Sequence, residues 1–328
     1  MEQLLRTRLT EKLGIVHPVM LAGMGGVSYH ALVAAVSEAG GFGCLGASTM
    51  SVANMESEIE AVKRLTDRPF GVDLLTAFPA DLVAQVEIVI EGGASVFVAG
   101  LGVPADVIEL CHSHNVVVVN MCGKVEHARR AVAAGCDIVV AQGTEAGGHT
   151  GLVATMPLVP QVVDAVGDQV PVVAAGGIFD GRGLAAALAL GADGVWVGTR
   201  FIATPEARSV TGYKEALVAT KEDGTTISRA YSGKTMRVVR NRYTDHFDSH
   251  PDELVPFPEQ LSRSYRQGAF HLGGDSATPG IDLEVECFPA GQGTGAISDL
   301  VPAGQLVERF VEEAHGVLSR LGAVASKR

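Results

Sequence analysis

The chain has 328 residues, of which 47% are hydrophobic, and it carries a formal net charge of −12. This length and apolar content are enough for a large hydrophobic core, and a charged fraction of 19% excludes wholesale disorder. An acidic chain without long runs of like charge lacks the basic surface that nucleic-acid binding requires, so we expect no nucleic-acid partner.

The N-terminal segment predicts no export signal. Residues 1–13 contain three basic side chains but no continuous apolar stretch. A run of roughly 18 or more uncharged apolar residues is also missing, which predicts no membrane span. The five cysteines are odd in number and form no CxxC pair, so we interpret them as reduced thiols. These features predict a cytoplasmic protein with neither a disulfide framework nor a metal site.

Short apolar runs rich in Val, Ile and Gly alternate with helical patterns over the first 200 residues. The runs are apolar throughout, as expected for parallel strands covered on both faces. We predict strands at 19–23, 42–47, 70–75, 95–100, 116–121, 137–142, 170–175 and 194–198. We predict helices at 29–39, 51–64, 80–91, 104–114, 124–134 and 180–190, with Ser51 as an N-cap. The near-even spacing favours a closed (β/α)8 TIM barrel over an open doubly wound sheet.

The regular alternation ends after the eighth predicted strand. Residues 206–299 are polar and rich in Gly and Pro, whereas 302–320 have the period of a helix. We therefore assign 1–205 and 300–328 to the barrel, and 206–299 to a long insertion between its last strand and last helix. The insertion is expected to be a lid or substrate wall over the C-terminal face, or else a packing subdomain or a dimerisation subdomain that forms a homodimer. The sequence leaves both alternatives open.

The most informative segment is 141–151, AQGTEAGGHTG, which follows the sixth predicted strand. TIM barrels carry their active sites at the C-terminal ends of the strands, so this loop belongs to the catalytic face. Gly147 and Gly148 would let backbone N–H groups approach a ligand closely. Because an imidazole exchanges protons near neutral pH, we predict His149 as the catalytic residue.

Two further glycine-rich segments, AAGGIFDGRG at 174–183 and GVWVGTRFIAT at 194–204, follow the seventh and eighth predicted strands. These loops of TIM barrels often bind phosphate through backbone N–H groups. Gly176 and Gly177 would allow the close approach, and Gly198 and Thr199 would supply donors, while Arg200 is either structural or neutralises the phosphate. GxGxxG after the first strand, Walker A, HExxH and GxSxG patterns do not occur. The sequence thus predicts a phosphate-bearing cofactor outside a Rossmann domain.

These segments, together with HPVMLAGMGGVS and AVSEAGGFGCLGA near the start, resemble the nitronate monooxygenase family. The same superfamily includes flavin-type enoyl-ACP reductases and NAD(P)H:quinone reductases. The likeness runs from about residue 8 to 242 and resumes weakly at 290–315, and it implies an FMN-binding TIM barrel. Asp73 stands where the family commonly carries Asn. The cofactor-binding residues that we predict are Ala22, Gly23, Met24, Asp73, Gln142, Gly147, Gly148, Gly176, Gly177, Gly198, Thr199 and Gln292.

The resemblance also implies where each of these residues would lie around the flavin. The loop of Ala22, Gly23 and Met24 would lie against the isoalloxazine ring, and the two late glycine loops would hold the phosphate. Gln142 and Gly147 would run along the flavin, and Gln292 would return to it from a late loop. His149 matches the histidine beside the substrate.

The resemblance implies oxidation of alkyl nitronates with dioxygen on bound FMN. His149 would hold a nitronate oxygen or, for a neutral nitroalkane, act as general base on the α-carbon. The alternative is an FMN reductase fed by NAD(P)H that acts on enoyl or other acyl thioesters or on quinones. In that alternative, Arg229, Arg237, Arg240 and Arg242 bind a CoA or nucleotide phosphate, or else form a solvated basic face. A flavin-free phosphate-binding enzyme and a non-catalytic flavin carrier form a third class.

Overall fold

The computed structural model describes residues 4–75, 82–100 and 102–325. At its centre lies a sheet of eight parallel strands in the order β1–β9–β8–β6–β5–β4–β3–β2. A parallel bridge between Met20 and Phe42 joins the two ends of this order and closes the ring, which confirms the predicted TIM barrel. All eight predicted strands are present: β1 (Val19–Leu21), β2 (Gly43–Gly46), β3 (Phe70–Leu74), β4 (Val96–Ala99), β5 (Val117–Cys122), β6 (Ile138–Gln142), β8 (Val172–Ala175) and β9 (Gly194–Val197).

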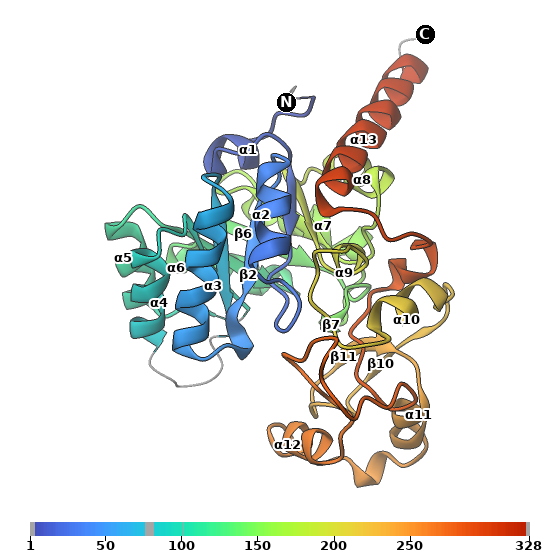
Figure 1. The fold of residues 1–328 in the computed structure, drawn as a ribbon. Coiled ribbons are helices and arrows are strands. Elements are labelled where there is room, and N and C mark those ends of the chain that lie inside the picture. The colour runs from blue at the N-terminus through green and yellow to red at the C-terminus, as the bar shows by residue number, and fades with distance from the viewer. Residues whose placement is uncertain (1–3, 76–81, 101, 326–328) are drawn as a thin grey trace.

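Helices surround the strands (Figure 1). The predicted ones are α2 (His30–Glu38), α3 (Val52–Leu65), α4 (Leu82–Glu91), α5 (Ala105–Ser113), α6 (Val125–Ala134), α8 (Gly181–Ala189) and α13 (Ala303–Ala325). The first residues of the predicted helix at 80–91 lie outside the described residues. Ser51 caps α3 as predicted, since its side chain accepts a hydrogen bond from the Asn54 N–H.

Two hydrophobic clusters explain why the strands form a ring. Along β1, Val19 and Leu21 point into the outer cluster shared with the helices, whereas Met20 points into the cluster inside the barrel. This alternation is the period-two pattern of a strand, with both faces apolar. The short helix α1 (Arg8–Leu13) adds Leu9 and Leu13 to the inner cluster. Because α1 precedes β1, it packs at the N-terminal end of the barrel, opposite the predicted active site.

One barrel helix was not predicted. The helix α7 (Thr155–Val166) fills the crossover between β6 and β8, although it contains Pro160. Proline removes a backbone donor and disfavours helix interiors, so Pro157 and Pro160 hid the helical period of this segment. The leucine and valines on its buried face, Leu158, Val159, Val162 and Val166, give the packing that compensates.

The insertion forms a second, smaller sheet whose strand order is β10–β11–β7. Two of these strands, β10 (Thr225–Ser228) and β11 (Met236–Val239), lie in the insertion, but β7 (Gly148–His149) lies in the loop after β6. The insertion also contains α10 (Tyr213–Ala219), α11 (Arg242–Ser249), η2 (Pro251–Glu253), α12 (Glu259–Arg266) and η3 (Gln292–Ala296), whereas the short α9 (Thr199–Ile202) directly follows β9. The remaining short element, η1 (Ala47–Thr49), follows β2.

The insertion has a hydrophobic cluster of its own, centred on the fully buried Tyr231. The Tyr231 ring stacks on Tyr243 at 4.9 Å between centroids, and its hydroxyl donates to the Val285 carbonyl at 2.9 Å. Such a core gives the insertion a defined shape, and in Figure 1 it lies below the barrel, while α13 projects from the opposite side. Its role as a lid or as a dimerisation surface stays a prediction.

The cysteines and the helix lengths bear on the expected absence of disulfides and membrane spans. All five cysteines are free and buried. Among the described residues, no helix combines the length and the apolar character that a membrane crossing requires.

Candidate active site

The predicted site residues gather at the C-terminal ends of the barrel strands. This follows from parallel topology, because the carboxyl ends of all eight strands meet at one end of the barrel. Ala22, Gly23 and Met24 follow β1, Asp73 lies near the end of β3, Gln142 ends β6, Gly176 and Gly177 follow β8, and Gly198 and Thr199 follow β9.

The loop after β1 contacts two other strand ends. A Cβ atom at Gly23 would lie only 2.2 Å from the Asp73 Cβ, so this position requires glycine for as long as Asp73 occupies its place. A Cβ at Gly198 would lie 3.2 Å from the Met24 sulfur. The loop after β1 therefore lies next to the end of β3 through Gly23 and next to the end of β9 through Met24.

The loop after β6 is held to the insertion by backbone pairing. In the sheet, His149 is opposite Met236 and Gly148 is opposite Arg237. The Gln142 side chain donates from Nε2 to the His149 carbonyl at 2.9 Å, which ties the same segment back to the barrel. His149 is thus anchored from both sides through its main chain.

The His149 ring is exposed to solvent but partly dehydrated by the surrounding protein. This desolvation, aided by the Lys234 ammonium, lowers the pKa of His149. Its Nε2 atom lies 2.9 Å from the Ser232 hydroxyl, which belongs to the insertion. A neutral imidazole near neutral pH follows from the lowered pKa.

A late turn returns to the site, where Gln292 was predicted. The Gln292 N–H donates to the Glu145 carbonyl at 2.9 Å, and the Gly291 N–H donates to the Thr199 hydroxyl at 3.0 Å. A Cβ at Gly147 would meet the main chain of Ala290 and Gly291 at 2.8 Å. The turn therefore connects the loop after β6 to the loop after β9.

The predicted site glycines differ in why each position requires glycine. Gly176 has φ +106°, and a Cβ there would lie 2.7 Å from the Thr155 hydroxyl, so protein packing alone requires glycine. The same holds for Gly147, whereas nothing lies within 4 Å of a Cβ built on Gly148. The space beside the Cα atom is therefore open at Gly148, whereas protein atoms fill it at Gly147 and Gly176.

The two phosphate loops nevertheless fit an anion. The N–H groups of Gly177, Gly198 and Thr199 make no hydrogen bond within the parts of the chain that the structure describes. They follow β8 and β9, which are adjacent in the ring. Unpaired backbone donors at neighbouring strand ends are a usual means of holding a phosphate group. The residues present therefore fit the phosphate of FMN.

Asp73 differs chemically from an ordinary surface carboxylate. The residue keeps a little solvent contact, but protein atoms surround its carboxyl group, and this desolvation raises its pKa well above the ordinary value of 3.8. Asp73 is therefore held toward its neutral, protonated form. Such a group can donate a hydrogen bond as an amide does.

We expect Asp73→Asn to remove a pH-dependent loss of stability. The pKa of Asp73 is raised in the folded protein. The contribution of Asp73 to the free energy of unfolding is therefore greatest below the ordinary pKa of 3.8 and is lost as pH rises from there through the folded pKa. The variant should gain stability relative to wild type across this window, by at most about 1.4 kcal/mol per pH unit. Urea unfolding at about pH 5 and about pH 8 measures the difference, with exposed Asp67→Asn as control. Parallel pH curves for Asp73→Asn and wild type would contradict the interpretation.

The arginines considered for phosphate binding have protein partners instead. Arg200 is buried and forms an ion pair with Asp299 at 2.5 Å, so it is structural. Arg240 pairs with Asp245 and Arg242 with Asp282 on the surface. The two others bond to carbonyl groups: Arg229 to Gly233, and Arg237 to Thr144. These contacts give no support to a CoA or nucleotide phosphate site on these side chains.

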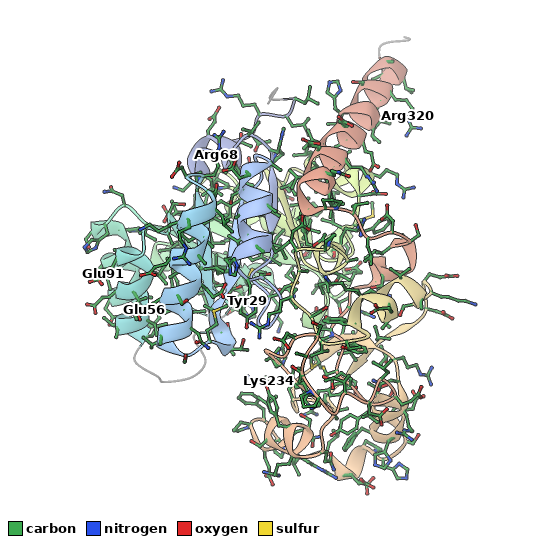
Figure 2. The ribbon with its side chains drawn as sticks, viewed as in Figure 1. Tyr29, Glu56, Arg68, Glu91, Lys234 and Arg320 are labelled. Carbon is green, nitrogen blue, oxygen red and sulfur yellow. The ribbon has the colours of Figure 1, made fainter. Side chains whose placement is uncertain are left out.

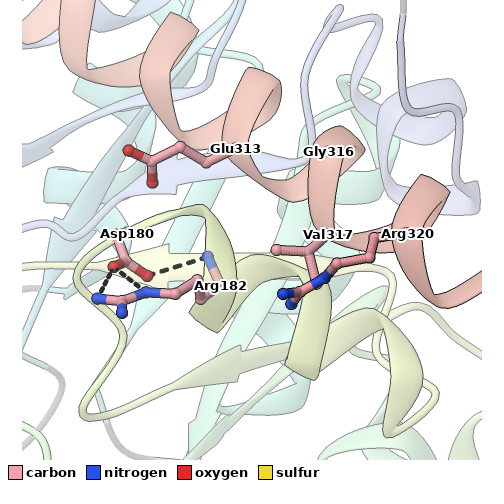
Figure 3. A pocket seen from close by; sticks show the side chains of 6 residues that line it. All are labelled: Asp180, Arg182, Glu313, Gly316, Val317 and Arg320. Atoms are coloured by element: carbon pink, nitrogen blue, oxygen red, sulfur yellow. Dashed lines mark hydrogen bonds and ion pairs between the residues drawn. The ribbon is translucent and has the colours of Figure 1, made fainter.

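A pocket of about 490 Å³ lies elsewhere, between α8 and α13 (Figure 3). It is lined by Asp180, Arg182, Glu313, Gly316, Val317 and Arg320. Asp180 caps α8 and pairs with Arg182, while Glu313 accepts from the Gly181 N–H. None of the predicted site residues lines this pocket. Its charges serve the packing of the two helices.

Among the residues that the structure describes, one group of side chains has the composition of a metal site: His246, His250 and Glu253, all exposed on the insertion. His246 already forms an ion pair with Glu253 at 3.0 Å. The three residues lie on α11 and η2 and the turn between them, and none is a predicted site residue.

Sequence reasoning missed two residues next to His149, Ser232 and Lys234. Both lie in the turn between β10 and β11, which comes near the barrel only because β11 pairs with β7. The segment YSGKT around them has no motif, so no signal in the sequence could have placed them beside the histidine.

The fold and the positions of the predicted site residues define the class: a TIM barrel with glycine-rich loops after β6, β8 and β9, the first of which carries His149. A model of the nitronate monooxygenase family matches residues 6–82 and 76–313. The chain belongs to the nitronate monooxygenase family and is an oxidoreductase.

The chain is similar to proteins with different names. The chain is 43% identical to a Mycobacterium tuberculosis protein named (3aS,4S,5R,7aS)-5-hydroxy-7a-methyl-1-oxo-octahydro-1H-indene-4-carboxyl-CoA dehydrogenase. The match covers 75% of this chain and 69% of that protein. The structure of FabK from Thermotoga maritima is 35% identical with a TM-score of 0.87, covering 98% of this chain and 99% of that one. Nitroalkane oxidase from Streptomyces ansochromogenes is 30% identical with a TM-score of 0.82, covering 95% and 99%.

Proposed function

We propose that the protein is an FMN-dependent oxidoreductase that oxidises alkyl nitronates with dioxygen as the final electron acceptor. The observation that carries the proposal is the pairing of an anion cradle after β8 and β9 with a neutral histidine anchored at the end of β6. The family match points to the same substrate class.

FMN, when bound, would supply the electron acceptor. The unpaired N–H groups of Gly177, Gly198 and Thr199 would hold its phosphate. The loop of Ala22, Gly23 and Met24 and the Asp73 carboxyl group would lie along its ring system, and Gln142 would fix the segment that carries His149. His149 would then hold an oxygen atom of the nitronate.

A second candidate is redox chemistry on an acyl-CoA thioester, with a nicotinamide as the partner. The 43% identity to a carboxyl-CoA dehydrogenase favours it. Against it, the arginines of the insertion that we considered for the CoA phosphates are engaged with protein groups. In this case His149 would hold the thioester carbonyl oxygen.

Anaerobic reduction of the purified flavoprotein, followed by absorbance, distinguishes the candidates. The protein is mixed separately with an alkyl nitronate, NADH, NADPH and an acyl-CoA. Rapid bleaching of the flavin band by the nitronate alone is the expected result. Bleaching by a nicotinamide or an acyl-CoA, with no response to the nitronate, would replace the first proposal with the second. A protein purified without any flavin band would contradict both.

A further inference from the structure

The two ring nitrogens of His149 have different environments. Nε2 lies 2.9 Å from the Ser232 hydroxyl oxygen. Nδ1 makes no hydrogen bond within the described part of the chain. Only Nδ1 is therefore left to meet a substrate, and its character depends on which nitrogen carries the proton of the neutral ring.

Ser232 can decide that question because its hydroxyl has a single hydrogen to donate. The Lys234 N–H lies 3.3 Å from the Ser232 oxygen, and a backbone N–H can only donate, so the oxygen accepts there. The hydroxyl hydrogen has three places to go: His149 Nε2 at 2.9 Å, which accepts only when it carries no proton, the Lys234 carbonyl at 3.3 Å and the Met236 sulfur at 3.8 Å. The shortest contact is the one to His149.

Burial strengthens this preference. Ser232 is fully buried, so no solvent competes for its hydroxyl. The nearby Lys234 ammonium disfavours a second proton on the His149 ring, and Lys234 itself is held 4.1 Å over the Phe257 ring. Figure 2 shows Lys234 on the insertion, below the barrel. The His149 ring therefore stays neutral and carries a single proton, on either Nδ1 or Nε2.

We propose that Ser232 is a positioning residue that donates to His149 Nε2 and so fixes the ring proton on Nδ1. His149 then presents a hydrogen-bond donor to the substrate, not a base. This deepens the proposed function and rests on it for the place of the substrate. The substrate class that fits is one with an oxygen already able to accept, a preformed nitronate or a thioester carbonyl. A neutral nitroalkane, whose α-carbon must first lose a proton to a base, does not fit.

Nitrogen NMR of the whole flavoprotein, labelled with ¹⁵N-histidine, tests the proposal without turnover. Protonated and unprotonated ring nitrogens resonate far apart, and His149→Gln identifies the signals of this ring among the ten histidines. Near neutral pH we expect a protonated Nδ1 and an unprotonated Nε2. Free histidine in water prefers the opposite tautomer, so the expected spectrum cannot arise by default. A proton on Nε2 in the wild type would overturn the proposal.

Two variants test Ser232 itself. Ser232→Ala should shift the His149 signals toward the Nε2-protonated form and lower kcat/KM on a nitronate about tenfold, the equivalent of about one neutral hydrogen bond. Ser232→Thr keeps the hydroxyl and should retain the Nδ1-protonated signals. Flavin absorbance reports whether each variant is folded, and wild-type spectra are interpretable even if a variant is not. An unchanged tautomer in folded Ser232→Ala would count against the proposal.

The two proposals fail separately. The NMR spectrum is recorded without substrate, so an enzyme that ignores nitronates can still show the expected tautomer. Conversely, a protein that oxidises nitronates with the ring proton on Nε2 would keep its proposed function and lose the role of Ser232.

Discussion

His149→Ala is expected to lower kcat/KM by about 100- to 1000-fold while FMN remains bound. The size of this effect is that of removing one donor aimed at an oxygen on which charge develops, in a site where water cannot replace it fully. The flavin should remain because the unpaired donors of the phosphate cradle, at Gly177, Gly198 and Thr199, belong to other strand ends. Steady-state kinetics and the flavin-to-protein absorbance ratio measure the two parts separately.

The control is His127→Ala, which removes an exposed imidazole from α6 on the outside of the barrel. It should leave both the rate and the flavin content at wild-type levels. If His149→Ala turns over nitronate as fast as this control, the assignment of His149 to the substrate is wrong. Loss of flavin together with activity would instead mean that His149 supports the cofactor.

Gly177→Asp is expected to expel FMN. The new carboxylate would enter the loop after β8, whose N–H groups are proposed to hold the phosphate. Two unit charges about 4 Å apart near a protein surface repel by about 4 kcal/mol, which corresponds to roughly a thousandfold weaker binding. The measurement is the dissociation constant of FMN, obtained by fluorescence titration of protein stripped of flavin.

Backbone strain must be separated from charge, because Gly177 has φ +71°. Gly14 offers a matched control, since it has φ +66°, ends α1 at the opposite face of the barrel, and has nothing within 4 Å of a built Cβ. Gly14→Asp should carry the same backbone strain, without the 3.1 Å contact that a Cβ at Gly177 would make with the Glu145 Cβ, and should keep full flavin affinity. Full flavin occupancy in Gly177→Asp would show that the phosphate lies elsewhere.

The barrel was predictable because its signals are local. Each strand is a short, wholly apolar run, which is the pattern expected of parallel strands covered on both faces. The helix α7 escaped prediction because Pro157 and Pro160 interrupt its pattern, and tertiary packing outweighed that local preference. The boundaries of the helices that were predicted lie within a few residues of the observed ones.

The site was predictable only in part. Glycine clusters and a histidine at strand ends indicate which loops matter, and the structure brings these loops together. The contact between Gly23 and Asp73 could not be read from the sequence, because the two residues lie on different strand ends and only the closure of the ring joins them. The same is true of Ser232, whose place depends on a two-residue strand too short to leave a pattern. The roles of the individual residues stay predictions.

The pairing of β7 with β11 makes chemical competence depend on the order of folding. Barrel units form from residues near in sequence, whereas the bond between His149 and Ser232 spans 83 positions. Contacts of such separation bear a larger loop-closure cost and form late, and a small sheet at the periphery also opens more readily than the core. A nascent or heat-stressed molecule that binds FMN as proposed would therefore hold it while the His149 ring has no fixed orientation. Flavin content alone would then overstate the fraction of working enzyme.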